Sequence, residues 1–242
     1  MIRAIPLRSN YFRQSQQGAE SEVLAHCPPA MRITTPPLPF PAMPMRVAVC
    51  VSGGGSNLGA LLAAFPPGSE AQVVLVLSNR PEAGGLERAR ATGVPAVTLA
   101  DPANGAEWLA HLEAHGVDLI VLAGYLRLVP SDVVAAWRGR IVNVHPALLP
   151  GFGGPGMYGA RVHRAVLDSG ASESGATVHL VDEEYDRGAI LAQERVPVVP
   201  GDTADSLAAR VLAAEHRLLP AVVRAAAAAG RPVPLPLSSE QV

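Results

Sequence analysis

An amide and an imidazole stand two residues apart in the apolar stretch IVNVHPALLP, residues 141–150. Side chains alternate between the two faces of a β-strand, so Asn143 and His145 point the same way, and Pro146 then prevents the ladder from continuing. An amide can donate to a developing oxyanion, and an imidazole can move a proton near neutral pH. A lone histidine in a strand is usually a hydrogen-bonded core residue, but burying both groups requires several partners. The stretch therefore indicates a strand that ends by presenting a reactive pair.

A carboxylate beside His145 would orient the ring and raise its pKa above the ordinary value of about 6.5. The acidic loop DEEYDRG, residues 182–188, offers four carboxylates. A solvated loop is the ordinary interpretation of such a run, and it suits Asp182, Glu183 and Glu184. Asp186, followed two residues later by Gly188, is the best candidate for a carboxylate held by a tight turn.

A second candidate site is the glycine loop SGGGSNL, residues 52–58, which directly follows an apolar run. Its glycines let the backbone approach a ligand closely, and the N–H groups that open the next helix favour an anion. The spacing is neither GxGxxG nor the Walker pattern, which disfavours dinucleotides and nucleoside triphosphates. Ser56 and Asn57 could add side-chain bonds to a phosphate. The alternative is a tight turn followed by a helix N-cap.

Metal and lysine chemistry are disfavoured. His145, His163, His179 and His216 form no pair with the spacing of a recognised metal site, so no metal is expected. His163 and His216 are interpreted as packing or helix-surface residues. All 19 basic residues are arginine, which excludes a Schiff-base lysine and a P-loop lysine.

The elements that must position these groups follow from short-range periodicity. Short β-branched runs predict strands at 46–51, 73–77, 95–99, 118–124 and 141–145. Helical stretches separate them at 57–65, 84–92, 105–116 and 131–138. This alternation predicts an α/β fold, with a Rossmann-like, mostly parallel sheet and helices on both faces. Later runs at 175–181 and 190–198 predict antiparallel or mixed strands, and a long helix is expected at about 203–229.

Composition sets the remaining limits. The chain has 242 residues, 49% of them hydrophobic, which suits one α/β domain at 45–232. Residues 1–44 are proline-rich and predicted to be a disordered or loosely docked extension, and 233–242 a tail. A net charge of −2 gives no basic field for nucleic acid. No apolar run is long enough to span a membrane, and the first 25 residues lack a signal-peptide apolar region, so a cytoplasmic protein is expected.

Six segments of the sequence occur in the order and approximate spacing of a known family: SGGGSNL, SNRPEAGGLERA, DLIVLAGYLRLV, IVNVHPALLP, GATVHLVDEEYDRGAI and AEHRLLP. Over about 45–232 the chain resembles the phosphoribosylglycinamide formyltransferases, a folate-dependent branch of the formyltransferase family. The resemblance implies transfer of the formyl group of 10-formyltetrahydrofolate, as co-substrate, to the amine of glycinamide ribonucleotide in de novo purine biosynthesis. It implies neither a metal nor a covalent enzyme intermediate.

The resemblance also implies residue roles. The implied catalytic residues are Asn143, His145 and Asp186, with His179 at most in support. Those implied to bind the nucleotide are Gly55, Ser56, Asn57 and Glu215. Those implied to enclose the folate are Leu126, Arg127, Leu128, Val129, Asn143, Asp182, Glu183, Glu184, Tyr185 and Asp186. In the implied mechanism the amine attacks the formyl carbon directly, while Asn143 and protonated His145 stabilise the oxyanion and Asp186 keeps the imidazole charged.

Three positions depart from the family pattern. Gly151 and Leu212 stand where relatives often carry lysine, or lysine or glutamine, and no arginine stands near Ala103. Two rival functions follow from the same sequence. One is a formyltetrahydrofolate deformylase, in which water replaces the amine; the other is a non-catalytic phosphate- or nucleotide-binding module. Oligomeric state is left open between monomer and homodimer.

Overall fold

The computed structural model of the protein describes residues 43–235. The predicted N-terminal extension, up to residue 42, and the end of the predicted tail lie outside the described residues. The strands are β1 (Met45–Val51), β2 (Ala71–Ser78), β3 (Ala96–Thr98), β4 (Leu119–Leu122), β5 (Ile141–His145), β6 (Glu173–Leu180) and β7 (Ile190–Pro197). The helices are α1 (Ser56–Ala64), α2 (Gly84–Ala91), α3 (Gly105–Ala114), α4 (Ser131–Ala136), α5 (Ala160–Asp168) and α6 (Ala204–Ala229).

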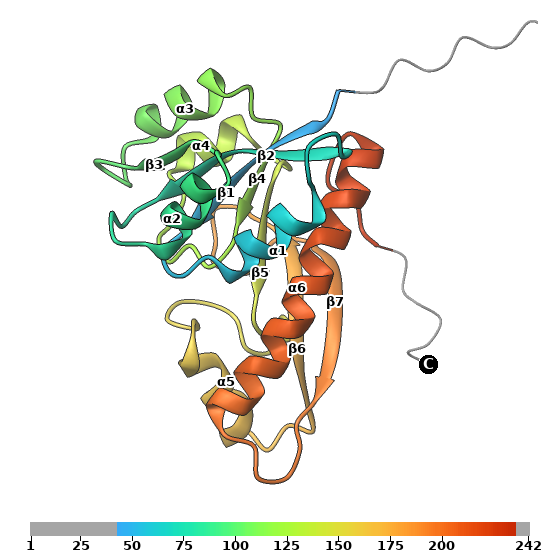
Figure 1. Cartoon of the computed structure of the whole chain (residues 1–242). Helices are drawn as coiled ribbons and strands as arrows, with labels where there is room; N and C mark the ends of the chain where they lie inside the picture. Colours follow the sequence, from blue (N-terminus) through green and yellow to red (C-terminus); the bar gives the residue numbers. More distant parts are fainter. Residues whose placement is uncertain (1–42, 236–242) are drawn as a thin grey trace, which may run out of the picture. The chain divides into compact units, whose positions relative to one another are not determined.

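The strands form one seven-stranded sheet in the order β3-β2-β1-β4-β5-β6-β7 (Figure 1). Strands β1 to β5 are parallel, whereas β6 pairs antiparallel with both β5 and β7. The predicted fold class, a mostly parallel sheet with antiparallel C-terminal strands and a long final helix, is confirmed. The strand order reverses between β1 and β4, and ligands of open α/β sheets bind at such a switch point, beyond the carboxyl ends of the strands.

Two hydrophobic cores cover the two faces of the sheet. Alternate residues of β1 divide between them: Val47 and Val49 pack with α1, α2 and α6, whereas Ala48 and Cys50 pack with α3 and α4. Both faces of the parallel strands are therefore buried, which explains why these strands are almost continuously apolar. Burial raises the pKa of the Cys50 thiol, as expected for an unreactive core cysteine.

Helix α5 was not predicted from the sequence. It has nine residues, as many as α1, and its buried positions 162, 163 and 166 have helical spacing, so a local signal was present and was overlooked beside the glycine-rich stretch before it. Its buried residues are Val162, His163 and Val166, and Val166 joins the core that also contains α6. The helix carries His163 toward the interior, as a packing residue.

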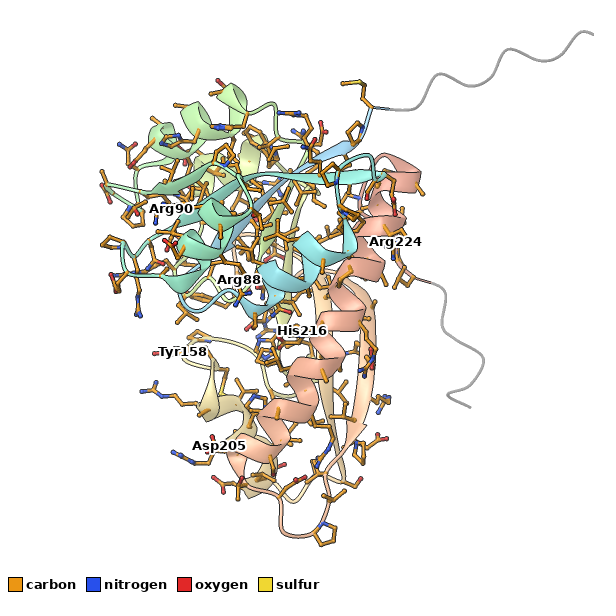
Figure 2. The ribbon with its side chains drawn as sticks, in the orientation of Figure 1. Arg88, Arg90, Tyr158, Asp205, His216 and Arg224 are labelled. Carbon is orange, nitrogen blue, oxygen red and sulfur yellow. The ribbon has the colours of Figure 1, made fainter. Side chains whose placement is uncertain are left out.

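Helix α6 extends over 26 residues and is bounded by strong signals at both ends. Thr203 and Ser206 form a reciprocal capping box, and Gly230 ends the helix with a left-handed φ of 69°. Arg224, labelled in Figure 2, connects α6 to the loop between α1 and β2, because its Nε donates to Glu70 at 2.7 Å. Within residues 43–235 no helix combines the length and apolar character needed to cross a membrane.

Candidate active site

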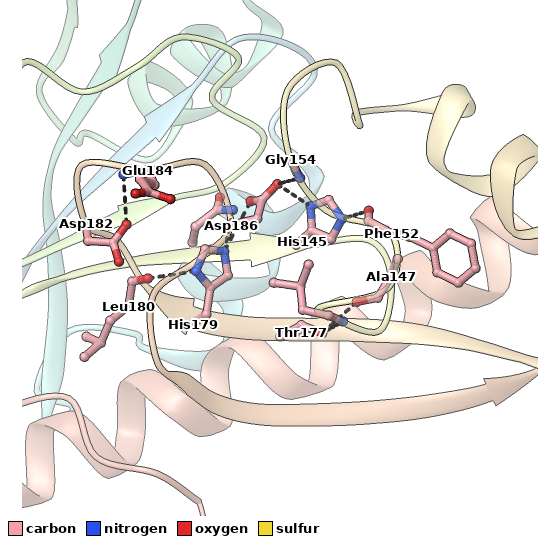
Figure 3. Close-up of polar contacts among 12 residues, drawn as sticks. His145, Ala147, Phe152, Gly154, Thr177, His179, Leu180, Asp182, Glu184 and Asp186 are labelled. Atoms are coloured by element: carbon pink, nitrogen blue, oxygen red, sulfur yellow. Dashed lines mark hydrogen bonds and ion pairs between the residues drawn. The ribbon is translucent and has the colours of Figure 1, made fainter.

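The reactive pair lies at the carboxyl end of β5, where the sheet stops. The Asn143 side chain is partly buried and faces a pocket, whereas His145 is 3% exposed. Strand β6 runs antiparallel beside β5 and places His179 opposite Asn143. Figure 3 shows His145 and His179 converging with Asp186, which the acidic loop brings in from beyond β6.

His179 fixes the orientation of the Asn143 amide. Its Nδ1 lies 2.7 Å from the Leu180 carbonyl oxygen, and since a carbonyl only accepts, Nδ1 carries the proton. Nε2 is then an acceptor, and the Asn143 Nδ2 donates to it at 3.0 Å. One N–H of the amide is thereby committed to His179, and the rest of the amide is available at the pocket wall.

His145 is held between a loop and a carboxylate. Its Nε2 donates to the Phe152 carbonyl oxygen at 2.7 Å, and its Nδ1 lies 3.7 Å from Asp186 Oδ2 (Figure 3). In the neutral ring the proton therefore sits on Nε2, and the unprotonated Nδ1 faces the carboxylate. A proton arriving at Nδ1 would complete an ion pair with Asp186.

The expectation that Asp186 raises the His145 pKa above its ordinary value is wrong, because the net shift is downward. Burial disfavours the imidazolium and lowers the pKa of His145 below its ordinary value of 6.5, although Asp186 and the Phe152 carbonyl act in the opposite direction. His179 lowers the His145 pKa slightly further. The free protein at neutral pH therefore holds His145 mainly as neutral imidazole.

Asp186 is placed by an unusual backbone conformation. It has φ of 54°, in the left-handed region that aspartate tolerates better than most residues. Gly188 is required nearby, because a Cβ there would lie 1.8 Å from the Leu180 carbonyl oxygen. Burial alone would raise the pKa of Asp186, but the Gly154 N–H, which donates to its Oδ2 at 2.9 Å, and the adjacent imidazoles lower it. The carboxylate is therefore ionised and fixed, with its side chain 11% exposed.

The remaining acids of the loop have more exposed surroundings. Glu183 forms an ion pair with Arg138 at 2.5 Å in which both side chains are more than half exposed. Asp182 Oδ1 accepts from the Glu184 N–H at 3.0 Å and so shapes the turn. These residues and the exposed Tyr185 line one wall of the pocket, beside Asp186.

The pocket has a volume of about 440 Å³, within the usual range for small-molecule sites. The opposite wall is formed by the residues between β4 and α4, which the structure brings together as expected: Leu126, Arg127, Leu128 and Val129. Ser52 holds this wall, since its Oγ accepts from the Leu126 N–H at 2.8 Å. The apolar lining with Asn143, His145 and Asp186 at one end suits a flat, largely apolar ligand that reacts at one end.

The glycine loop follows β1 and opens α1, which has no side-chain N-cap and no acid in its first turn. Gly55 has φ of 68°, and a Cβ there would lie 2.7 Å from Gly85 Cα, so glycine is required. Ser56 is exposed at the helix start. The first-turn N–H groups therefore remain available to an anion.

Asn57 joins this loop to α6. Its Nδ2 donates to Glu215 Oε2 at 2.6 Å across 158 residues of sequence, and both side chains are buried. Burial raises the pKa of Glu215, and the Asn57 amide only partly offsets this. Asn57 Oδ1 has no partner among the described residues. A buried carboxylate and an unpaired amide oxygen side by side both call for hydrogen-bond donors from a ligand or a water molecule.

Several functional residues escaped the sequence interpretation. Phe152 acts through its carbonyl and Gly154 through its N–H, so neither side chain gave a signal. Ser52 was visible as part of the glycine loop, but its bond to the Leu126 segment joins residues 74 apart. Among residues 43–235, no three histidine, cysteine or acidic side chains are arranged to hold a metal ion.

Comparison with known proteins shows which family this chain belongs to. The model of the formyl transferase family matches residues 45–223. A relative from Arabidopsis thaliana, phosphoribosylglycinamide formyltransferase, is 48% identical over 188 residues, covering 74% of this chain and 64% of that protein. The trifunctional purine biosynthetic protein adenosine-3 of Drosophila melanogaster is 46% identical over 184 residues, 72% of this chain and 13% of that one. The chain thus spans less than two thirds of these relatives' lengths.

Solved structures of formyltransferases and a related deformylase have a similar fold. Phosphoribosylglycinamide formyltransferase from Brucella melitensis superposes with a TM-score of 0.70 at 45% identity, covering 81% of this chain and all of that one. A formyltetrahydrofolate deformylase from Pseudomonas syringae superposes with a TM-score of 0.69 at 25% identity, covering 78% of this chain and 63% of that one.

Proposed function

The chain belongs to the formyl transferase family, and from that premise we propose that it transfers the formyl group of 10-formyltetrahydrofolate to the amine of glycinamide ribonucleotide, in purine biosynthesis. The single observation that carries the proposal is the arrangement of two sites along one edge of the sheet. Asn143, His145 and Asp186 lie at the end of the apolar pocket, and the anion-binding first turn of α1, with Asn57 and Glu215, follows β1.

The substrates are assigned by what each site can bind. The pocket between Leu126–Val129 and the acidic loop would hold the folate, with its formyl carbon at the Asn143 end. The N–H groups of Gly55, Ser56 and Asn57 would bind the phosphate of the nucleotide. Glu215 would accept hydrogen bonds from its hydroxyl or amine groups.

In the reaction, His145 starts as neutral imidazole. As the amine attacks, a C–N bond forms and the formyl oxygen becomes negative, and an N–H of Asn143 stabilises this oxyanion. His145 takes the amine's proton at Nδ1 and becomes an imidazolium that Asp186 stabilises. It then gives a proton to the departing folate nitrogen as the original C–N bond breaks. The family resemblance implied that His145 is protonated from the start. In this proposal His145 instead gains its proton during the reaction.

An absorbance assay for loss of 10-formyltetrahydrofolate tests the proposal. Turnover that requires glycinamide ribonucleotide is expected. Equal turnover without the nucleotide would instead indicate the deformylase reaction, in which water replaces the amine. No turnover under either condition would indicate a phosphate- or nucleotide-binding module. The partly buried, ionised Asp186 beside His145 favours catalysis over the binding module, since a binding site has no need of that pair.

A further inference from the structure

The chain contains no lysine, so a side-chain cation at the phosphate site of the proposed function has to come from an arginine or a protonated histidine. The glycine loop itself, residues 52–58, contains no basic residue. We propose that Arg88 of α2 supplies this charge and binds the phosphomonoester of the substrate at the first turn of α1. The inference rests on the proposed function and adds a substrate-binding residue to it.

The close approach of two glycine pairs brings α2 to this site. The Gly85 N–H donates to the Gly53 carbonyl at 3.0 Å, and a Cβ on Gly84 would lie 3.4 Å from Gly54 Cα. The absence of side chains thus lets the start of α2 pack directly on the glycine loop. Arg88 comes one helical turn after Gly84, so it lies on the same side of α2 as the loop.

The Arg88 guanidinium lies against α1 itself. A Cβ built on Gly59 would be 3.2 Å from Arg88 Nη1 and 3.5 Å from Cζ. Gly59 belongs to the first turn, because its N–H donates to the Gly55 carbonyl at 2.9 Å. Helical Cβ atoms tilt toward the N-terminus, so this contact places the charge beside the end of α1 that carries the free N–H groups.

This charge is uncommitted within residues 43–235. No side-chain hydrogen bond or ion pair of the described residues uses the Arg88 guanidinium, whereas Arg90 on the same helix lies 3.8 Å from Glu87. Figure 2 shows Arg88 next to α1 and Arg90 on the side of α2 away from α1. An exposed arginine with no acid beside it, next to an uncapped helix start, suits a dianionic phosphate, which arginine can bind bidentately.

An independent observation points to a ligand at this turn. Asn57, in the same turn, is 7% exposed, and its Oδ1 has no hydrogen-bond partner among the described residues. Buried polar atoms are rarely left unpaired unless a ligand or water satisfies them. The unpaired oxygen of Asn57 and the uncommitted Arg88 guanidinium both adjoin the first turn of α1, which suits a ligand with an anionic group and hydroxyl or amine donors.

The test compares Arg88→Gln with Arg90→Gln, which removes the same charge two residues away. We expect Arg88→Gln to raise the KM for glycinamide ribonucleotide about tenfold or more, as for loss of a charge-assisted hydrogen bond. The KM for the folate should change less than about twofold, and Arg90→Gln should leave both within about twofold. The KM of Arg88→Lys for glycinamide ribonucleotide should lie between those of the wild type and Arg88→Gln, because lysine keeps the charge but cannot bind the phosphate bidentately.

Calorimetric binding of the nucleotide without folate, and thermal midpoints, complete the experiment. Weaker nucleotide binding by Arg88→Gln at an unchanged midpoint supports the proposal. If Arg88→Gln leaves nucleotide binding and KM unchanged, or if Arg90→Gln has an equal effect, the proposed role of Arg88 is overturned. The proposed function still stands in that case, provided that the wild type turns over the nucleotide. Failure of the wild type to turn over the nucleotide overturns the proposed function, and the role of Arg88 with it.

Discussion

At the residue scale, His145 and Asp186 titrate as a pair in a buried setting. Asp186 is kept ionised by its hydrogen-bonding neighbours, and burial keeps His145 neutral until a proton arrives. The neutral Nδ1 beside a carboxylate is a base in the free protein and becomes an acid once protonated. One side chain can therefore serve both proton transfers of the proposed reaction.

Asp186→Asn tests this pairing. The substitution keeps size and hydrogen bonding but deletes the charge, and we expect kcat to fall on the order of 10²–10⁴. Because Asp186 raises the His145 pKa, its removal lowers that pKa further. The acid limb of the kcat/KM profile, expected below about pH 6.5 in the wild type, should therefore move to lower pH. Rates measured between about pH 5 and 8 check both effects.

The other loop acids provide matched controls. The other acids of the loop are Asp182, Glu183 and Glu184. When each is changed singly to its amide, kcat should fall much less than in Asp186→Asn. Comparable damage from one of them, or a nearly silent Asp186→Asn, would show that the third catalytic residue is wrongly assigned.

Glu215→Gln should act on nucleotide binding. The buried carboxylate loses one strong acceptor, so the KM for glycinamide ribonucleotide should rise on the order of tenfold, with the folate KM nearly unchanged. Asp205→Asn, an exposed acid of the same helix, is the control and should leave both values unchanged. Equal effects of Glu215→Gln on both substrates would point to misfolding instead.

At the scale of the elements, glycines differ in whether the surrounding structure could accept a side chain. Gly59 lies within α1, where a Cβ would contact only the flexible end of Arg88, whereas Gly188 packs against the rigid Leu180 backbone. Gly59→Ala should raise the free energy of unfolding by about 0.5–1 kcal/mol, the helix-interior difference between alanine and glycine. Gly188→Ala should displace the acidic loop and reduce both stability and kcat. Urea unfolding and steady-state rates distinguish these outcomes, and a destabilising Gly59→Ala would contradict this account of α1.

At the scale of the whole molecule, burial lowers the pKa of His145, His163 and His216. As pH falls through about 6.5, the unfolded chain therefore binds protons before the folded protein does, and stability decreases. The raised Glu215 pKa acts in the opposite sense, but it is one group against three. We expect a smaller free energy of unfolding at pH 5.5 than at pH 7.5, with a smaller difference in His216→Gln. Equal stability at both pH values would contradict the prediction.

The sequence by itself determined the architecture and the reactive pair. Strand and helix periodicities are local, so alternating runs were enough to predict the parallel sheet, its antiparallel end and α6. The two-residue repeat of a strand likewise placed Asn143 and His145 on one face before any tertiary contact was known. Helix α5 was missed although its buried residues 162, 163 and 166 have helical spacing, because the glycine-rich stretch before it suggested a long loop. The catalytic and binding roles of the site residues stay predictions.

Only the tertiary structure decided the protonation and the partners of these groups. The pKa of His145 depends on desolvation by surrounding segments, and no spacing along the chain reveals that burial outweighs Asp186. The Asn57–Glu215 bond, the Phe152 carbonyl on His145 and the Arg88 guanidinium against Gly59 join segments that are distant in sequence or act through the backbone. Local pattern encodes which elements form, whereas electrostatics and hydrogen bonding depend on what those elements bring together when they pack.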